Sequence, residues 1–178
     1  MRKNILLWGI IVLLISLKTE GEKQELASYQ DKSYKFQFAY PKNWVLQADD
    51  AKKGYLALYS PDALAANQKY KTNELLCGIK IEILTLNKNR AATFTQMTNG
   101  MTTCFVLQKK KEKINQYCKK VTDKQAEHPY LFYILSVVKG NNYKTLIIAY
   151  IPEKEKKQKY KKKYDQIILS FKFLKNGS

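Results

Sequence analysis

The sequence predicts an α+β domain, an α-β-α sandwich with a central antiparallel sheet. Segments that alternate apolar and polar side chains predict strands, because successive side chains of a strand point to opposite faces. The clearest pair is 130–139 and 143–151, which is apolar on both faces, as expected of strands covered on two sides, and is joined by a Gly140-Asn141-Asn142 turn whose residues tolerate a positive φ. Two other segments, 91–107 and 154–173, space their apolar residues by three and four, as amphipathic helices do. With one helix available for each face of the sheet, a sandwich is the expected packing.

The first half of the chain is predicted to hold most of the remaining strands. An aromatic strand covers 34–40, and a turn then leads to an extended segment at 44–46, so that a hairpin-like unit opens the domain. Further strands are predicted at 54–60, which Pro61 stops, and at 75–86, which alternates. Residues 62–72 lie between them and contain several alanines, which favours one short helix, with a loop as the alternative.

The second half of the chain is predicted to hold both long helices. The first one, over 91–107, places an apolar stripe at Phe94, Met97, Met101 and Phe105. Residues 114–121 then predict an edge-like strand that is polar enough to face water on one side. In the last helix, 154–173, an apolar stripe faces the core and seven lysines lie between 154 and 163. The stripe consists of Tyr160, Tyr164, Ile167, Ile168 and Phe171.

The N-terminus has the order of an export signal, because two basic residues precede the apolar run 5–17 and a polar segment follows it. As a helix this run would be ~20 Å long, short of the ~30 Å hydrocarbon core, which favours a cleaved signal over a membrane span. An uncleaved N-terminal anchor is the alternative, since no A-x-A cleavage pattern follows the run. The sequence thus predicts an extracytoplasmic protein, either periplasmic or secreted. Its predicted parts are a signal peptide or anchor at 1–21, a short linker at 22–28 and one domain at 29–175.

Three cysteines are expected to form one disulfide and leave one free thiol in an oxidising compartment. Cys104 and Cys118 would close a loop of about 15 residues, which contributes roughly 3 kcal/mol in the chain-entropy account. Cys77 is in phase with Ile79 and Ile81, so it is predicted to be a buried thiol. Pairing of Cys77 with either of the other two is the alternative.

The formal charge of +17 favours anionic partners, such as phospholipid headgroups or the acidic polymers of an envelope. Nearly all of the cations are lysines, which lack the planar fork of arginine, so general solubility with weak adhesion is the alternative. Nucleic-acid binding is disfavoured, because Tyr160 and Tyr164 belong to the core stripe and leave the lysine face without stacking groups. The predicted anionic-surface contact is the lysine face of the last helix, made of Lys156, Lys157, Lys159, Lys161, Lys162 and Lys163.

Both ends of the predicted domain resemble PsbP-like proteins. The opening Y-x-x-K-x-Y-K-F-Q-F-A-Y-P-K-N-W, from Tyr29 to Trp44, is similar to the signature in which an aromatic strand runs into Tyr-Pro, two turn residues and Trp. The stretch from Tyr164 to Phe173 resembles the closing helix of the same superfamily, which includes a Ran-binding protein and many exported bacterial proteins. The resemblance implies an α-β-α sandwich of the bacterial exported branch. It implies a non-enzymatic binding or assembly factor and no catalytic or metal residues.

The residues themselves offer little material for catalysis. The chain has one histidine, His128, and no serine-hydrolase elbow, zinc-protease motif, C-x-x-C or phosphate-binding glycine loop. No cofactor is predicted. The alternative is an extracytoplasmic enzyme of hydrolase or thiol-redox type, with Cys77 or Cys104 paired with His128. We therefore predict an exported binding or assembly factor that acts at a membrane or envelope surface, toward an anionic partner or a protein complex.

Overall fold

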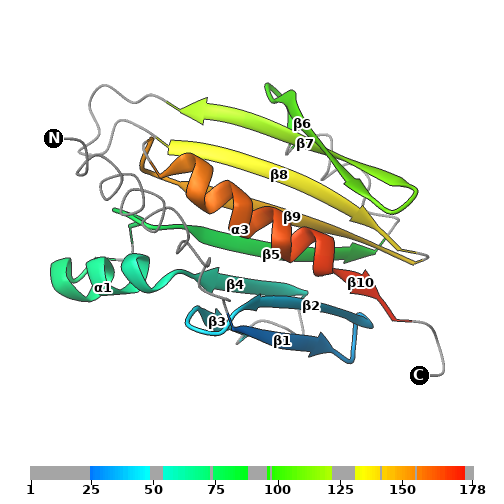
Figure 1. Cartoon of the computed structure of the whole chain (residues 1–178), viewed down its shortest axis with the longest axis horizontal. Coiled ribbons are helices and arrows are strands. Elements are labelled where there is room, and N and C mark those ends of the chain that lie inside the picture. Colours follow the sequence, from blue (N-terminus) through cyan, green and yellow to red (C-terminus); the bar gives the residue numbers. More distant parts are fainter. Residues whose placement is uncertain are drawn as a thin grey trace, which may run out of the picture.

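The structure is a computed structural model that describes residues 25–48, 54–72, 74–87, 96, 98–121, 131–140, 142–154 and 156–174. These residues form two antiparallel sheets and two helices, which confirms the predicted α+β class (Figure 1). The elements are β1 Leu26–Asp31, β2 Phe36–Pro41, β3 Val45–Gln47, β4 Tyr55–Tyr59, α1 Pro61–Tyr70, β5 Lys80–Asn87, β6 Thr102–Lys109, β7 Glu112–Val121, β8 Leu131–Lys139, β9 Tyr143–Ile151, α3 Lys157–Ser170 and β10 Lys172–Phe173. Among the described residues, no helix is long and apolar enough to cross a membrane.

The small sheet has the strand order β1-β2-β10 and joins the two ends of the domain. In β2, Phe36 pairs with Asp31 of β1 on one side and with Phe173 of β10 on the other. Strand β1 begins at Leu26, earlier than the predicted start of the domain at residue 29. The predicted hairpin-like unit is wrong, because β2 belongs to this sheet, whereas β3 pairs with β4 in the other sheet.

The large sheet has the strand order β3-β4-β5-β9-β8-β7-β6. The predicted hairpin of β8 and β9 is confirmed, with Lys139 opposite Lys144 at its turn. Gly140 follows Lys139, and a Cβ atom there would lie 2.6 Å from the ring of Phe173. Glycine is therefore required here because β10 approaches the backbone closely. The φ of Gly140 does not lie in the positive range that the turn residues tolerate. Strand β7 lies between β6 and β8, so its predicted edge position is wrong.

The helix predicted over 91–107 is also wrong in its second half. Gln96 and Thr98 have helical backbone geometry, but Gly100 has a φ of +72°, and the chain then continues as β6. A residue in the left-handed region ends a right-handed helix. The predicted second helical layer is therefore not found in the described part of the chain, and the sandwich arrangement is not confirmed. Residues 91–95 and 97 lie outside the described residues.

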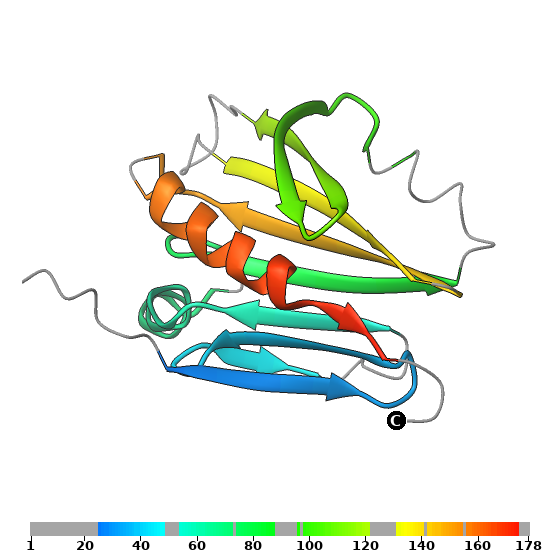
Figure 2. The same cartoon turned by 45° about the vertical axis from the view of Figure 1, so that its right-hand side comes forward.

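Helix α3 packs across both sheets and forms the main core with them (Figure 2). Its buried residues follow the predicted stripe, and the hydroxyl of Tyr164 donates to the carbonyls of Ile134 and Ile147 in β8 and β9. The helix ends before the predicted residue 173, because Phe171 adopts an extended backbone, with a ψ of 130°. The ring of Phe171 stacks on that of Phe36, with centroids 4.9 Å apart. The closing helix and the aromatic strand are thus held together by direct ring contacts.

Candidate functional site

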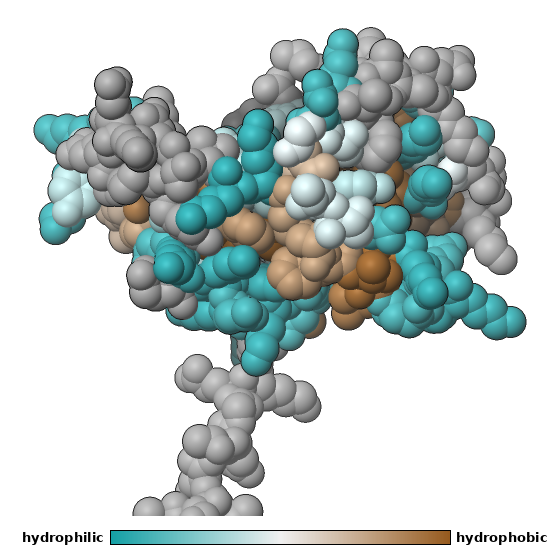
Figure 3. Space-filling model, turned by 90° about the horizontal axis from the view of Figure 1, so that it is seen from above, coloured by the Kyte–Doolittle hydropathy of each residue, from teal (hydrophilic) through white to brown (hydrophobic). Residues whose placement is uncertain are grey.

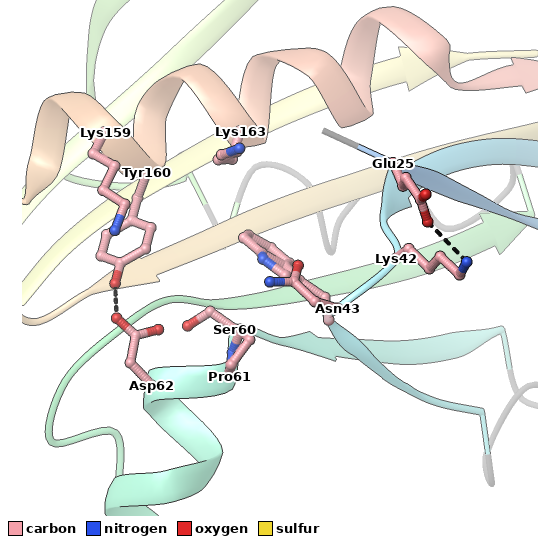
Figure 4. A pocket seen from close by; sticks show the side chains of 10 residues that line it. Glu25, Lys42, Asn43, Ser60, Pro61, Asp62, Lys159, Tyr160 and Lys163 are labelled. Atoms are coloured by element: carbon pink, nitrogen blue, oxygen red, sulfur yellow. Dashed lines mark hydrogen bonds and ion pairs between the residues drawn. The ribbon is translucent and has the colours of Figure 1, made fainter. Parts of the chain in front are cut away.

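A groove of about 960 Å³ opens between α3, the start of α1 and the turn after β2 (Figure 4). Three elements that are far apart in the sequence supply its walls, so the groove exists only in the folded domain. Its lining consists of Glu25, Lys42, Asn43, Trp44, Ser60, Pro61, Asp62, Lys159, Tyr160 and Lys163.

The first wall is the Pro-Lys-Asn-Trp turn, which belongs to the segment that resembles PsbP-like proteins. The backbone N–H of Trp44 donates to the carbonyl of Pro41 over 2.9 Å and closes the turn. The indole is buried in the main core, with 7% of Trp44 exposed, and fixes the turn to the domain. Lys42 pairs with Glu25 over 2.8 Å, but both side chains are more than two-thirds exposed, so this ion pair contributes little stability.

The second wall is the start of α1, where a carboxylate is held in place from two sides. Tyr160 of α3 donates a hydrogen bond to Asp62. Burial alone would raise the pKa of Asp62, but hydrogen bonds from Ser60 and Tyr160 outweigh it and lower that pKa. Burial and the bond to Asp62 raise the pKa of Tyr160. Asp62 is therefore an ionised acceptor that ties α1 to α3, and the Nζ of Lys156 lies 4.0 Å from it as an ionic partner.

The third wall is α3, which brings two lysines into the groove. Lys159 and Lys163 are four residues apart and so lie on the same side of the helix. Among the described residues, neither has a carboxylate within 4.0 Å. Burial, followed by repulsion from Lys159, lowers the pKa of Lys163. The groove lining holds three lysines and two carboxylates, so the groove carries a net positive formal charge.

The six lysines predicted to form one contact surface fall into two groups. Lys156 pairs with Glu153 over 2.8 Å, and Lys161 pairs with Asp165 over 2.5 Å. Lys157 lies over the ring of Phe132, with 3.8 Å from its Nζ to the ring centroid. Lys159, Lys162 and Lys163, like Lys157, have no acidic partner among the described residues, and Lys159 lies over the ring of Tyr160, with 5.4 Å from its Nζ to the ring centroid. The ion pairs of Lys156 and Lys161 are with residues three and four positions away, so their spacing is visible in the sequence, whereas the contact of Lys157 with Phe132 depends on the fold.

The cysteines do not form a catalytic centre in the described residues. Cys104 and Cys118 lie at disulfide-bonding distance, with Cα atoms 5.8 Å apart, which agrees with the predicted pair. Cys77 is free and half-buried, and its Sγ donates to the backbone carbonyl of Asp62 over 3.2 Å. Burial, followed by the charge of Asp62, raises the pKa of Cys77, which disfavours the thiolate that a nucleophile needs. His128 lies outside the described residues, which contain no group of three or more potential metal ligands.

A second charged cluster lies on the face of the large sheet that points away from α3. Glu82 accepts hydrogen bonds from the hydroxyls of Tyr55 and Tyr150, at 2.9 and 2.7 Å, and pairs with Lys80 over 2.6 Å. Burial would raise the pKa of Glu82, but Lys80 and the two tyrosines outweigh it and lower that pKa. Burial and the bond to Glu82 raise the pKa of Tyr55 to about 12. Sequence reasoning missed this cluster, because its strands pair across long separations.

Glu82→Gln is expected to lower the free energy of unfolding at pH 7 by about 1–2 kcal/mol, because it removes an ionised acceptor from three donors. A carboxyl whose pKa is lowered in the folded state stabilises the protein above its unfolded pKa, and this contribution is lost as the pH falls through the folded value. The difference between the two proteins should therefore shrink below about pH 4.5. Urea titrations across this range measure it, with exposed Glu74→Gln as the control. A difference that grew on acidification would contradict the assigned role of Glu82.

No protein-family model matches this chain, and no curated protein does. Among solved structures, it is similar to a crystal structure of a protein from Bacteroides thetaiotaomicron, with 11% identity and a TM-score of 0.55, over 85% of this chain and 49% of that one. The chain thus spans about half the length of that protein.

Two smaller solved proteins are also similar to this chain. One is cyanobacterial PsbP (CyanoP) from Synechocystis, with 12% identity and a TM-score of 0.48, over 90% of this chain and 99% of that one. The other is the Ran-binding protein Mog1p of Saccharomyces cerevisiae, with 12% identity and a TM-score of 0.45, over 85% of this chain and 96% of that one. At 11% identity, the likeness to the Bacteroides thetaiotaomicron protein is one of fold alone.

Proposed function

We propose that this chain is an exported, non-enzymatic binding protein that attaches to an anionic partner at a membrane or envelope surface. The observation that carries the proposal is the groove beside α3, where Lys159 and Lys163 lie together without an acidic partner among the described residues. Exposed Lys162 lies next to them in the sequence and adds to the same positive field. We call Lys159, Lys162 and Lys163 the groove lysines.

The charge of the rest of the chain supports this assignment. A formal charge of +17 attracts anionic surfaces from beyond contact distance, so that encounter is fast, while the groove lysines supply the local contact. An anion placed between Lys159 and Lys163 would remove the repulsion that lowers the pKa of Lys163. Binding of this kind requires no bond making or breaking. The enzyme alternative depends on a thiolate, and the raised pKa of Cys77 works against it.

Replacing the groove lysines with glutamine is expected to weaken binding to anionic vesicles strongly. At about 1 kcal/mol per lysine near the surface, the triple variant should bind roughly 100-fold more weakly. Co-sedimentation with phosphatidylcholine vesicles, with and without phosphatidylglycerol, at low and then at high salt, measures this affinity. The expected result is binding to the anionic vesicles only, and loss of that binding as the salt concentration rises.

The matched control removes the same charge elsewhere, through Lys32→Gln, Lys119→Gln and Lys139→Gln at exposed positions outside α3. This control should retain most of the affinity. Equal losses in both triple variants would mean that net charge alone controls adhesion. An unchanged affinity in the groove variant would exclude the groove as the contact surface.

A further inference from the structure

Strand β6 lies at one end of the large sheet and has an open side. It pairs with β7, and no other described strand pairs with it. The other edges are formed by β1, β3 and β10 and have six, three and two residues, whereas β6 has eight. The backbone N–H and C=O groups along an edge strand are free to pair with another extended chain, which makes β6 the longest such template in the described structure.

The side chains of β6 do not protect this edge in the usual way. Natural edge strands are guarded by charged residues, especially lysine, yet 102–108 carries no charge in a chain that is 26% charged. Lys109 ends the strand, but its Nζ donates to the carbonyls of Ile168 and Phe171 and so is directed toward α3. Val106 is 57% exposed. Figure 3 views the molecule from the side of β6 and β7 and shows pale and brown side chains surrounded by teal ones.

The edge is also held rigid before any partner arrives. Cys104 and Cys118 join β6 to β7 at the place where the register shifts between Thr103 and Phe105. From Phe105 onward the two strands pair regularly, up to Lys109 opposite Glu112. A strand that is already fixed loses little conformational entropy when another strand pairs with it.

The charges at the end of β6 decide what kind of strand fits. Lys110, Lys111 and Lys113 are exposed around the turn into β7 and outnumber the acidic Glu112. A second copy of this chain would bring another charge of +17, which opposes self-association. We propose that β6 binds an extended segment of a protein partner by β-strand addition. That segment has an uncharged, β-branched stretch along the strand and acidic residues beside the lysines of the turn. This surface shares no residue with the groove, so it is independent of the anionic-surface proposal.

The test uses a synthetic peptide of alternating Thr and Val with a pair of Glu residues at one end, added to the folded, ¹⁵N-labelled chain. Three comparison peptides accompany it: one with Lys in place of Glu, one with the Glu pair moved to the other end, and one with alternate backbone nitrogens methylated. The expected result is a set of amide shift changes confined to 102–113. Moving the Glu pair should weaken binding, and both the Lys peptide and the methylated peptide should bind at least about tenfold more weakly, because they lose charge attraction or backbone hydrogen bonds.

The variant that blocks the edge is Val106→Lys. It places at an exposed position of β6 a lysine, the residue that commonly disfavours pairing at natural edge strands. Leu169→Lys is the matched control, since Leu169 is also exposed, at 41%, but lies on α3. We expect at least about tenfold weaker peptide binding for Val106→Lys and unchanged binding for Leu169→Lys. Equal binding of the methylated peptide, or shift changes outside 102–113, would overturn the proposal. It would also be overturned if sedimentation showed a dimer that Val106→Lys dissociates, because the occupant of the edge would then be a second copy.

Discussion

Phe171→Ala is expected to lower the free energy of unfolding by about 3–5 kcal/mol, a large share of the stability of an ordinary domain. The ring of Phe171 is fully buried between α3 and the small sheet. It stacks on Phe36 and Phe38, with centroids 4.9 and 6.1 Å away, and meets Phe173 edge-on at 5.5 Å. Truncation would leave a cavity that these rings cannot fill without giving up their own contacts.

Urea denaturation followed by circular dichroism measures this loss for Phe171→Ala. The matched control is Leu169→Ala, two residues earlier in the last turn of α3, where Leu169 is 41% exposed and a change of less than about 1 kcal/mol is expected. The comparison separates loss of the aromatic cluster from a general weakening of α3. Equal destabilisation by the two substitutions would show that the Phe171 ring is not the main link between helix and sheet.

Loss of the Cys104–Cys118 bond is the second large effect that we expect. The bond closes a loop with a sequence separation of 14. Its removal should lower the free energy of unfolding by about 3 kcal/mol, because the unfolded chain gains conformational entropy when the loop is opened. For a domain of this size, that corresponds to a fall in Tm of roughly 6–12 °C. Thermal scans of Cys104→Ser, and of the unsubstituted chain with and without reductant, measure it.

Cys77→Ser is the control for this experiment, since the Cys77 thiol is free and half-buried. It should leave Tm nearly unchanged and preserve the response to reductant, whereas Cys104→Ser should remove that response. If Cys77→Ser removed it instead, Cys77 would have to take part in the disulfide.

Local signals explain what the sequence could predict of the fold. The β8–β9 hairpin depends on neighbouring residues, so its two apolar runs and short turn were sufficient to find it. Residues 91–107 carried two signals at once, because Met101 and Phe105 have helical spacing, whereas Thr102, Thr103, Phe105 and Val106 are of the β-branched and aromatic types that favour strands. Gly100, with its positive φ, separates the helical residues before it from strand β6 after it. Nothing in the spacing of the apolar residues identified it as a boundary.

Non-local pairing explains what the sequence could not predict. Strand β10 has two residues and is a strand only because it pairs with β2, which lies at the other end of the domain in the sequence. The same holds for the groove, where the bond between Tyr160 and Asp62 spans 98 positions. The lysine face of the last helix was visible from its spacing. The ion pairs of Lys156 and Lys161 are local, whereas the contact of Lys157 with Phe132 and the position of Lys159 and Lys163 beside α1 depend on the folded arrangement.

The pairing of β2 with β10 also determines when the fold can be completed during synthesis of the chain. A ribosome releases Phe36 and Phe38 early, yet the residues that cover them, Phe171 and Phe173, emerge among the last. During synthesis the aromatic strand therefore remains without its final neighbours, and a chain that stops before Phe171 cannot close its core. Contacts of such long sequence separation make folding slow. This delay is consistent with the export that we propose, because a chain that crosses a membrane unfolded would finish folding on the far side.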